Sequence, residues 1–172
     1  MSPFVPKSWE NAPSTATPLS AAALIDLETR LTTYVDATCR LTRTVAQSIP
    51  NNTVTTLAWD SEREDSEGMH VAGSTDVVIV TPGLYMLNLQ ASFAANATSI
   101  RALYLYKGTT VVELTNVDAA STGVTALTMS STLRLVANDV VTAKVLQNSG
   151  GALDVTKAAD YSPEFQVVRL GP

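Results

Sequence analysis

Few residues in this chain are of the types that support catalysis. His70 is its only histidine and Cys39 its only cysteine, and they are far apart in sequence. A Ser/His/Asp or Cys/His device needs its groups within hydrogen-bond reach of one another, and the sequence places no partner beside either residue. It also has no Walker loop, GxGxxG, HExxH or CxxC motif. We therefore expect no enzyme activity, no catalytic residue and no cofactor, and we interpret Cys39 as a small apolar residue.

One acidic run has residues that could bind a cation. Residues 60–68 read Asp-Ser-Glu-Arg-Glu-Asp-Ser-Glu-Gly, and carboxylates followed by a glycine faintly resemble a Ca²⁺ loop. The run lacks Asp or Asn at the later ligand positions of an EF-hand, and it lies between expected strands. We predict a solvated acidic loop at residues 60–67 and no metal site, and leave cation binding by this loop open.

Charge and hydropathy exclude two classes of partner. Eleven basic and 16 acidic residues give a net charge of −5, whereas nucleic-acid binding favours a basic protein. Apolar runs are interrupted before they reach the length that spans a bilayer. Residues 1–7 lack the basic and then apolar layout of a signal peptide. The sequence predicts no nucleic-acid partner and no membrane insertion. We expect a protein that is made in a cytoplasm, where it stays and is assembled into a virion, or that leaves by a route other than Sec.

A low charge content points to association with further copies. Charged residues make up 16% of the chain and hydrophobic residues 45%. Charge is depleted in the cores of protein interfaces, so we expect a homo-oligomer. The alternative is a monomeric sandwich with a threonine-rich exterior, since threonine suits strands.

Residues 43–172 would have to position any functional site, and their sequence predicts β-strands. Residues 76–93 are the most apolar stretch, and Pro82-Gly83 divides them into two strands joined by a tight corner. Short strands separated by turn residues predict an antiparallel sandwich. The expected strands are 44–49, 53–59, 69–71, 77–80, 84–93, 100–107, 110–116, 125–136, 140–147 and 165–170.

Two of these strands have aromatic residues on one face. In residues 84–93 we assign one face to the core and the other to a neighbouring subunit; the latter contains Tyr85, Leu87, Leu89 and Phe93. Tyr104 and Tyr106 share a face of the strand 100–107, and we place them in the subunit interface as well. Exposed aromatic residues also suit contact with a sugar or another protein, which is the alternative for this pair.

A helix is expected at residues 20–42, after the cap-like Thr17-Pro18. Apolar residues recur at alternating spacings of three and four, which is the seam of a short coiled coil. The predicted seam contains Leu24, Leu27, Leu31, Tyr34 and Leu41. We interpret the helix as an intersubunit stem, with a helix packed on its own sandwich as the alternative.

Residues 1–19 form an expected docking arm. Four prolines in this segment prevent both a helix and a central strand. Phe4 and Trp9 lie in the arm, where no core is available to them. We predict that they anchor the arm to a partner; the alternative is that they fold back on their own domain.

The strand that follows the corner resembles a known superfamily. Pro82-Gly-Leu-Tyr85, the long strand to Phe93 and the alternating strand from Arg101 resemble the tumour-necrosis-factor-like and complement globular-head domains. The resemblance implies an antiparallel jelly-roll sandwich whose subunits form tight trimers around an aromatic-rich axis. The calcium ligands and receptor loops of that superfamily have no counterpart here.

The N-terminal part resembles a second group. Trp9, the segment Thr17-Pro-Leu-Ser-Ala-Ala-Ala-Leu24 and Glu28 resemble the entry segment of tailed-phage minor tail and fibre proteins. The resemblance implies a virion protein whose arm docks onto other virion proteins. Its trimeric knob would contribute to adsorption on a host-surface glycan or protein. The alternatives are a capsid decoration or head-fibre protein and, more remotely, a carbohydrate-active jelly-roll enzyme.

Overall fold

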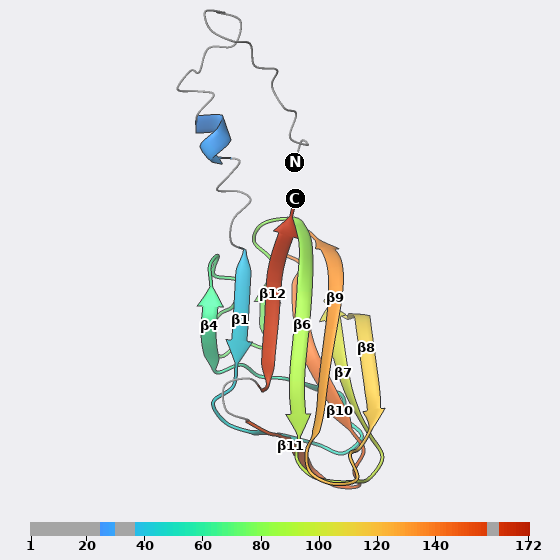
Figure 1. Ribbon diagram of the computed structural model, residues 1–172. Coiled ribbons are helices and arrows are strands. Elements are labelled where there is room, and N and C mark those ends of the chain that lie inside the picture. The colour runs from blue at the N-terminus through green and yellow to red at the C-terminus, as the bar shows by residue number, and fades with distance from the viewer. Residues whose placement is uncertain (1–24, 30–36, 158–161) are drawn as a thin grey trace, which may run out of the picture. The chain divides into compact units, whose positions relative to one another are not determined.

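The computed structural model describes residues 25–29, 37–157 and 162–172 (Figure 1). The chain divides into two compact units, Met1–Asp36 together with Pro172, and Ala37–Gly171. In the first unit, residues 25–29 form a helical turn. The second unit is the β-sandwich, which contains all twelve strands of the described residues.

The strands follow the chain in order and are joined mostly by short turns. They are β1 (Thr38–Thr42), β2 (Gln47–Ile49), β3 (Thr55–Thr56), β4 (Ser61–Asp65), β5 (Asp76–Val78), β6 (Gly83–Phe93), β7 (Ile100–Lys107), β8 (Thr110–Asp118), β9 (Thr125–Leu135), β10 (Val140–Gln147), β11 (Leu153–Val155) and β12 (Glu164–Gly171). Every pairing between these strands is antiparallel.

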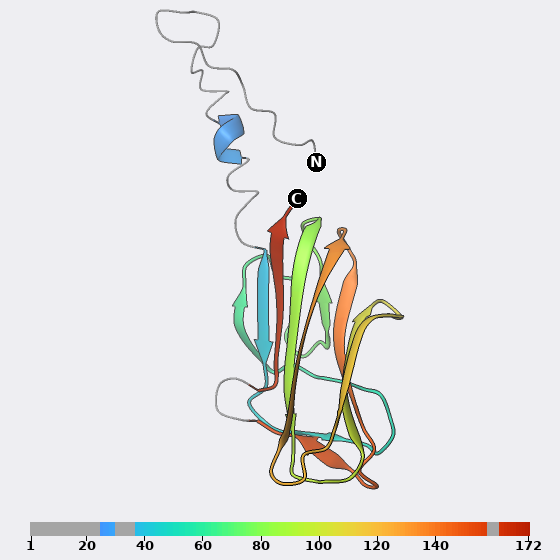
Figure 2. The same cartoon turned by 45° about the vertical axis from the view of Figure 1, so that its right-hand side comes forward.

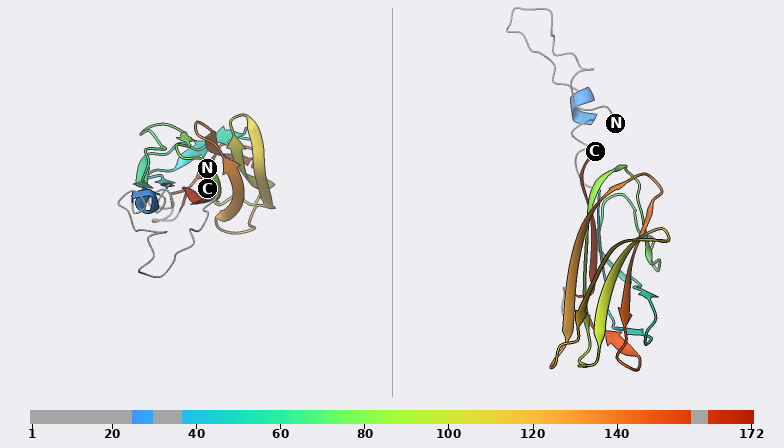
Figure 3. Two further views of the ribbon diagram at one scale, coloured as in Figure 1. Left: turned by 90° about the horizontal axis from the view of Figure 1, so that it is seen from above. Right: turned by 90° about the vertical axis from the view of Figure 1, so that its right-hand side faces the viewer.

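Two sheets pack face to face (Figures 2 and 3). Sheet A has the order β2-β11-β6-β12-β1-β4, and β9 pairs with β6 along its whole length. Sheet B has the order β3-β10-β7-β8, with β5 also paired to β10. The predicted antiparallel jelly-roll sandwich is confirmed. The sequence-based bounds of the strands at 100–107 and 140–147 coincide with those of β7 and β10.

Alternation along the strands directs one set of side chains into the core between the sheets, as the pleat requires. Tyr85, Leu87 and Leu89 of β6 are at most 1% exposed, and Leu103 and Leu105 of β7 are fully buried. The ring of Trp59 stacks on that of Phe165, 6.0 Å between centroids, at one end of this core.

The first strand corrects one part of the predicted stem. Residues 38–42 form β1, which pairs with β12 and β4, and its Cys39 and Leu41 are core residues. Placing Leu41 in a helical seam was therefore wrong, and the sandwich includes residues from Ala37 onward. The error arose because Leu41 continues a spacing of three and four, while Thr-Cys-Arg-Leu-Thr also alternates with period two.

The rest of the stem and arm stays a prediction. Leu27 lies in the described helical turn and is 45% exposed. Leu24, Leu31, Tyr34, Phe4, Trp9 and the arm at 1–19 lie outside the described residues. Within the described residues, no helix combines the length and the hydrophobicity that crossing a membrane would need.

The Pro82-Gly83 corner moves the chain from one sheet to the other. β5, before the corner, belongs to sheet B, and β6, after it, begins sheet A's longest pairing. Gly83 is buried against the end of β12, where an added Cβ would overlap with the carbonyl oxygen of Gly171 and the side chain of Arg169. This close approach leaves no room for a side chain, so a glycine is required here. The requirement does not come from the backbone φ angle of Gly83.

Candidate functional site

Four of the predicted interface residues belong to the core of a single chain. Tyr85, Leu87, Leu89 and Phe93 are at most 1% exposed. The Tyr85 hydroxyl donates a hydrogen bond to the Thr81 carbonyl oxygen at 2.6 Å. Burial, and secondarily the nearby Glu67 carboxylate, raises its pKa to about 12. Assigning these four side chains to a neighbouring subunit was wrong, because the sandwich uses this face of β6 for its own core.

The opposite face of β6 forms the centre of sheet A's outer surface. Met86 and Asn88 are half-buried there, and the register places Thr132 and Ser130 of β9 beside them on one side and Val168 and Gln166 of β12 on the other. On these three described strands the charged residues of this face are Arg134 at one end and Glu164 at the other. We call this surface the sheet A face.

A shallow pocket lies in the polar part of the sheet A face. Its volume is about 440 Å³, and it is lined chiefly by Asn88, Gln90, Thr128, Ser130, Glu164 and Gln166. Glu164 is held at its rim, because Arg40 Nη2 lies 3.0 Å from Glu164 Oε2 and the Gln166 amide donates to Oε1. Amide and hydroxyl groups at this density can form hydrogen bonds with a second protein surface without the cost of burying unpaired charge.

The edge of sheet B at β8 has exposed apolar side chains. β8 is nine residues long and hydrogen-bonds only to β7 among the described strands. Val111 and Leu114 are 44% and 45% exposed. In the pairing of β8 with β7, Val111 lies opposite Tyr106 and Leu114 lies opposite Tyr104. We name these four residues the β7–β8 patch.

Tyr104 and Tyr106 are half-buried on the outer face of sheet B. Their ring centroids are 6.3 Å apart, and Lys144 Nζ lies 4.0 Å from the centroid of Tyr106. The two tyrosines therefore lie on sheet B, so each chain has both the β7–β8 patch and the sheet A face. The prediction that these tyrosines contact a second subunit stays a prediction.

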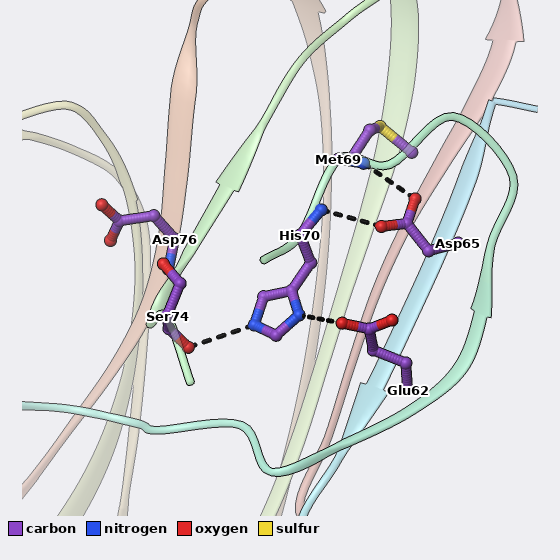
Figure 4. Close-up of polar contacts among 6 residues, drawn as sticks. All are labelled: Glu62, Asp65, Met69, His70, Ser74 and Asp76. Carbon is purple, nitrogen blue, oxygen red and sulfur yellow. Dashed lines mark hydrogen bonds and ion pairs between the residues drawn. The ribbon is translucent and has the colours of Figure 1, made fainter. Parts of the chain in front are cut away.

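The acidic run and His70 form one polar cluster (Figure 4). Residues 61–65 are strand β4, so the predicted acidic loop at 60–67 is wrong for this part of the run. His70 Nδ1 lies 2.6 Å from Glu62 Oε1 and Nε2 lies 3.1 Å from the Ser74 carbonyl oxygen. The Asp65 carboxylate accepts hydrogen bonds from the backbone N–H groups of Met69 and His70, each at 2.8 Å.

The hydrogen bonds of this cluster hold backbone segments in place. The carboxylates of Glu62 and Asp65 are already bound within the cluster, and Glu67 accepts a hydrogen bond from Thr81. No group of three or more histidine, cysteine, aspartate or glutamate side chains among the described residues is arranged to hold a metal ion. The cluster ties the segment after β4 to the start of β5.

Cys39 lies beside this cluster, paired with Asp65 of β4, and it is buried. Burial is the main reason that its thiol pKa is raised to about 12, and the Asp65 and Glu62 carboxylates raise it further. A thiol that stays protonated is a poor nucleophile. Its interpretation as a small apolar residue is confirmed, although it lies in the sandwich instead of the stem.

The comparisons with known proteins bear on the fold. No protein-family model matches the sequence, and a search of curated proteins found no relative. Among solved structures, murine APRIL is similar at 15% identity and a TM-score of 0.58, over 77% of this chain and 98% of that one. The globular domain of a zebrafish complement 1qA protein is similar at 11% identity and a TM-score of 0.59, over 78% of this chain and 98% of that one. An Eiger TNF of S. frugiperda is similar at 10% identity and a TM-score of 0.58, over 78% of this chain and 92% of that one. The sandwich therefore has the TNF-like and complement-1q-like jelly-roll fold.

Proposed function

We propose that this chain is a non-enzymatic structural protein of a tailed-phage virion. In this proposal it forms a homotrimeric minor tail or fibre-type knob, docks by its N-terminal arm onto other virion proteins and contributes to adsorption on the host surface. The resemblance of Trp9 and residues 17–28 to phage tail and fibre entry segments supports the virion assignment. The jelly-roll fold supports the knob.

The sheet A face is the observation that carries self-association. It is formed by β6 and β9, the two longest strands, together with β12. On these three strands its charged residues lie at the ends, and charge depletion marks the cores of interfaces. The β7–β8 patch is a different surface with exposed apolar and aromatic side chains. We propose that the patch of one copy packs against the sheet A face of the next.

A contact between two different surfaces is heterologous, and repeated contacts of this kind form a ring when the rotation between copies closes and an open filament when it does not. A ring of three is the assembly that the family resemblance implies. In such a ring Tyr104 and Tyr106 lie at the subunit boundary. The predicted stem seam, without Leu41, would also join the three chains.

Light scattering on the purified full chain tests the assembly. We expect a mass three times the 18.2 kDa of one chain at micromolar concentration. A monomeric mass under these conditions would refute the trimer. Removing residues 1–16 tests the arm, since we expect the shortened chain to remain trimeric and to be lost from particles.

The alternative is that a protein of the same architecture lies on the capsid, as a decoration or head-fibre protein. A competition assay separates the two, because an adsorption protein in purified form should reduce binding of the particle to host cells. A decoration protein would leave adsorption unchanged and would instead alter the stability of the capsid. Imaging the protein on the particle gives its location directly.

A further inference from the structure

Four loops gather at one end of the sandwich. They join β2 to β3, β6 to β7, β8 to β9 and β10 to β11, and they comprise residues 50–54, 94–99, 119–124 and 148–152. The register brings them together, because the last residue of β6 pairs with the first of β9, the last of β8 with the first of β7, and the last of β2 with the first of β11. We call these loops the loop end. It is the lower end of the sandwich in Figure 1, and β12 ends at the upper one.

Hydrogen bonds tie the four loops into one row. The joining contacts run from Gly150 N–H to Asn51 Oδ1 at 2.8 Å, from Ile100 N–H to Asn148 Oδ1 at 2.9 Å, and from Ala119 N–H to the Ser99 carbonyl oxygen at 2.7 Å. Each contact connects one loop to the next loop or to the strand that directly follows it. A surface whose loops are already fixed loses little conformational freedom on binding.

Arg101 holds the loop between β6 and β7 in an arrangement that proteins normally avoid. The residue is 0% exposed, and no described carboxylate forms an ion pair with it. Its guanidinium donates to the carbonyl oxygens of Asn96, Thr98 and Ile100 at 2.7 to 2.9 Å, and its Nε has no partner in the structure. Burying a charge without a counter-charge is costly, and departures of this kind are expected at functional sites. The buried arginine is therefore a second sign that this loop has a function that needs a fixed conformation.

The loop end is polar but has no charge of its own. None of the residues in the four loops is charged or aromatic, although 16% of the chain is charged. Of the residues that directly flank the loops, only Asp118 is charged. Val54 and Val124 are exposed apolar residues of the loops, at 40% and 56%. The other exposed side chains with polar groups are Asn51, Asn52, Thr53, Thr98, Ser99, Ser121 and Thr122.

We propose that the loop end binds an uncharged saccharide chain of the host surface. Hydroxyl and amide side chains both donate and accept hydrogen bonds, as the hydroxyl groups of a sugar do, and the two valines can contact its C–H groups. A charged ligand would lose water here without gaining a counter-charge. A protein ligand would favour aromatic or arginine anchors, and the four loops contain neither.

This inference rests on the proposed function, in which the knob contributes to adsorption. The proposed ring uses the sheet A face and the β7–β8 patch, so the loops are left free for a ligand. In a closed ring the three copies of the loop end lie at the same height along the axis. Contacts that are weak in one copy can then act together on a repeating saccharide chain.

The competition assay with the purified full chain, the phage particle and host cells tests the location. Ala97→Glu and Ala152→Glu each add one carboxylate to an exposed position in a different loop. We expect each variant to need about tenfold more protein for the same inhibition of adsorption, since the added charge is desolvated without a partner. Ala137→Glu is the matched control, because Ala137 is also exposed but follows β9 at the other end of the sandwich.

Two treatments of the host cells test the chemical class of the ligand. Periodate cleaves the vicinal diols of sugars, and a protease removes surface proteins. We expect labelled full chain to lose binding to periodate-treated cells and to keep it on protease-treated cells. Raising the salt concentration should leave binding unchanged, because an uncharged ligand has no ion pair with the protein to be screened.

The outcomes separate this inference from the proposed function. If the natural chain does not compete with the particle, the role in adsorption fails and this inference fails with it. If the natural chain competes and the two loop variants, with unchanged mass and circular dichroism, compete as well as Ala137→Glu, only the loop end is refuted. Binding that is lost after protease but not after periodate, or that falls as salt is raised, would refute the uncharged saccharide and leave the role in adsorption standing.

Discussion

Two edge strands of the sandwich, β4 in sheet A and β8 in sheet B, differ in length and charge. β4, at the edge of sheet A, has five residues, and four of them are charged. β8, at the edge of sheet B, has nine residues, two of them charged, and it exposes Val111 and Leu114. An uncovered strand edge is a template for pairing with another chain, and proteins protect it with short strands and charge.

This difference indicates which edge faces water. β4 has both protective features, and its carboxylates are also used internally to hold His70 and the following backbone. β8 is longer and has two charged residues against four in β4, and an exposed long edge with apolar side chains is an aggregation hazard. We infer that another copy covers the β8 side and that the β4 side remains open.

Leu114→Arg gives the largest expected effect on this comparison. An arginine in the centre of the β7–β8 patch would be buried without a partner in the trimer, which costs about 3–5 kcal/mol. We expect a monomer with an unchanged fold, measured by light scattering together with circular dichroism. Glu64→Arg in β4 is the matched control and should leave the mass trimeric. If the two results were exchanged, the roles of the edges would be reversed.

His70→Phe tests whether the β4 side is held by internal contacts. The substitution keeps an aromatic ring but leaves the Glu62 carboxylate and the Ser74 carbonyl oxygen without their partner. The expected loss of unfolding free energy is about 1–3 kcal/mol, the cost of unsatisfied polar groups, measured by urea denaturation. The oligomeric mass should not change, since this cluster lies away from the proposed contact; dissociation would contradict the assignment of β4 to solvent.

Sequence patterns predicted the middle of the fold better than its edges. β7 and β10 are flanked by turn residues and alternate clearly, so their bounds could be predicted. β1 was missed because its apolar residues also fit a helical spacing. β4 was missed because its charged residues have low strand propensity, and its pairing with β1 overrides that propensity.

The functional surfaces depend on topology, which a single sequence does not contain. Both faces of β6 are largely apolar, so the core face could not be separated from the outer face until Ser130 and Gln166 of the neighbouring strands were placed beside Asn88. A second pocket, at the end of β1, combines residues that are more distant still in sequence, from Arg43 to Ser162. No local pattern joins them.

Tyr104→Ala tests the extent of the β7–β8 patch at its inner side. Tyr104 is paired across the strand with Leu114 but is more covered by its own sheet. We expect the trimer to dissociate about tenfold more readily, since truncating a peripheral aromatic residue costs about 1–1.5 kcal/mol. Analytical ultracentrifugation over a range of concentrations measures this. Thr56→Ala, on the distant side of sheet B, is the control, and a loss equal to that of Leu114→Arg would place the centre of the contact on β7.

Asp139→Asn should have the smallest effect, because the change lies in a turn at the end of sheet B near the start of β8. Lys107 Nζ is 2.7 Å from Asp139 Oδ2, which also accepts the Val136 N–H at 2.8 Å. Burial by itself would raise the pKa of Asp139, but the hydrogen bonds from Lys107 and Val136 and the Lys107 charge lower it.

A carboxylate with a lowered pKa contributes stability above its unfolded pKa and loses that contribution as the pH falls through the folded pKa. Asp139→Asn should therefore lower the unfolding free energy at neutral pH by less than about 1 kcal/mol, as for other partly exposed pairs. The difference from the natural chain should disappear in acid. Thermal denaturation at a series of pH values measures both. The mass should stay trimeric. If this substitution dissociated the trimer, the subunit contact would extend to the turn between β9 and β10, and the contrast between the two edges would not be limited to the apolar residues of β8.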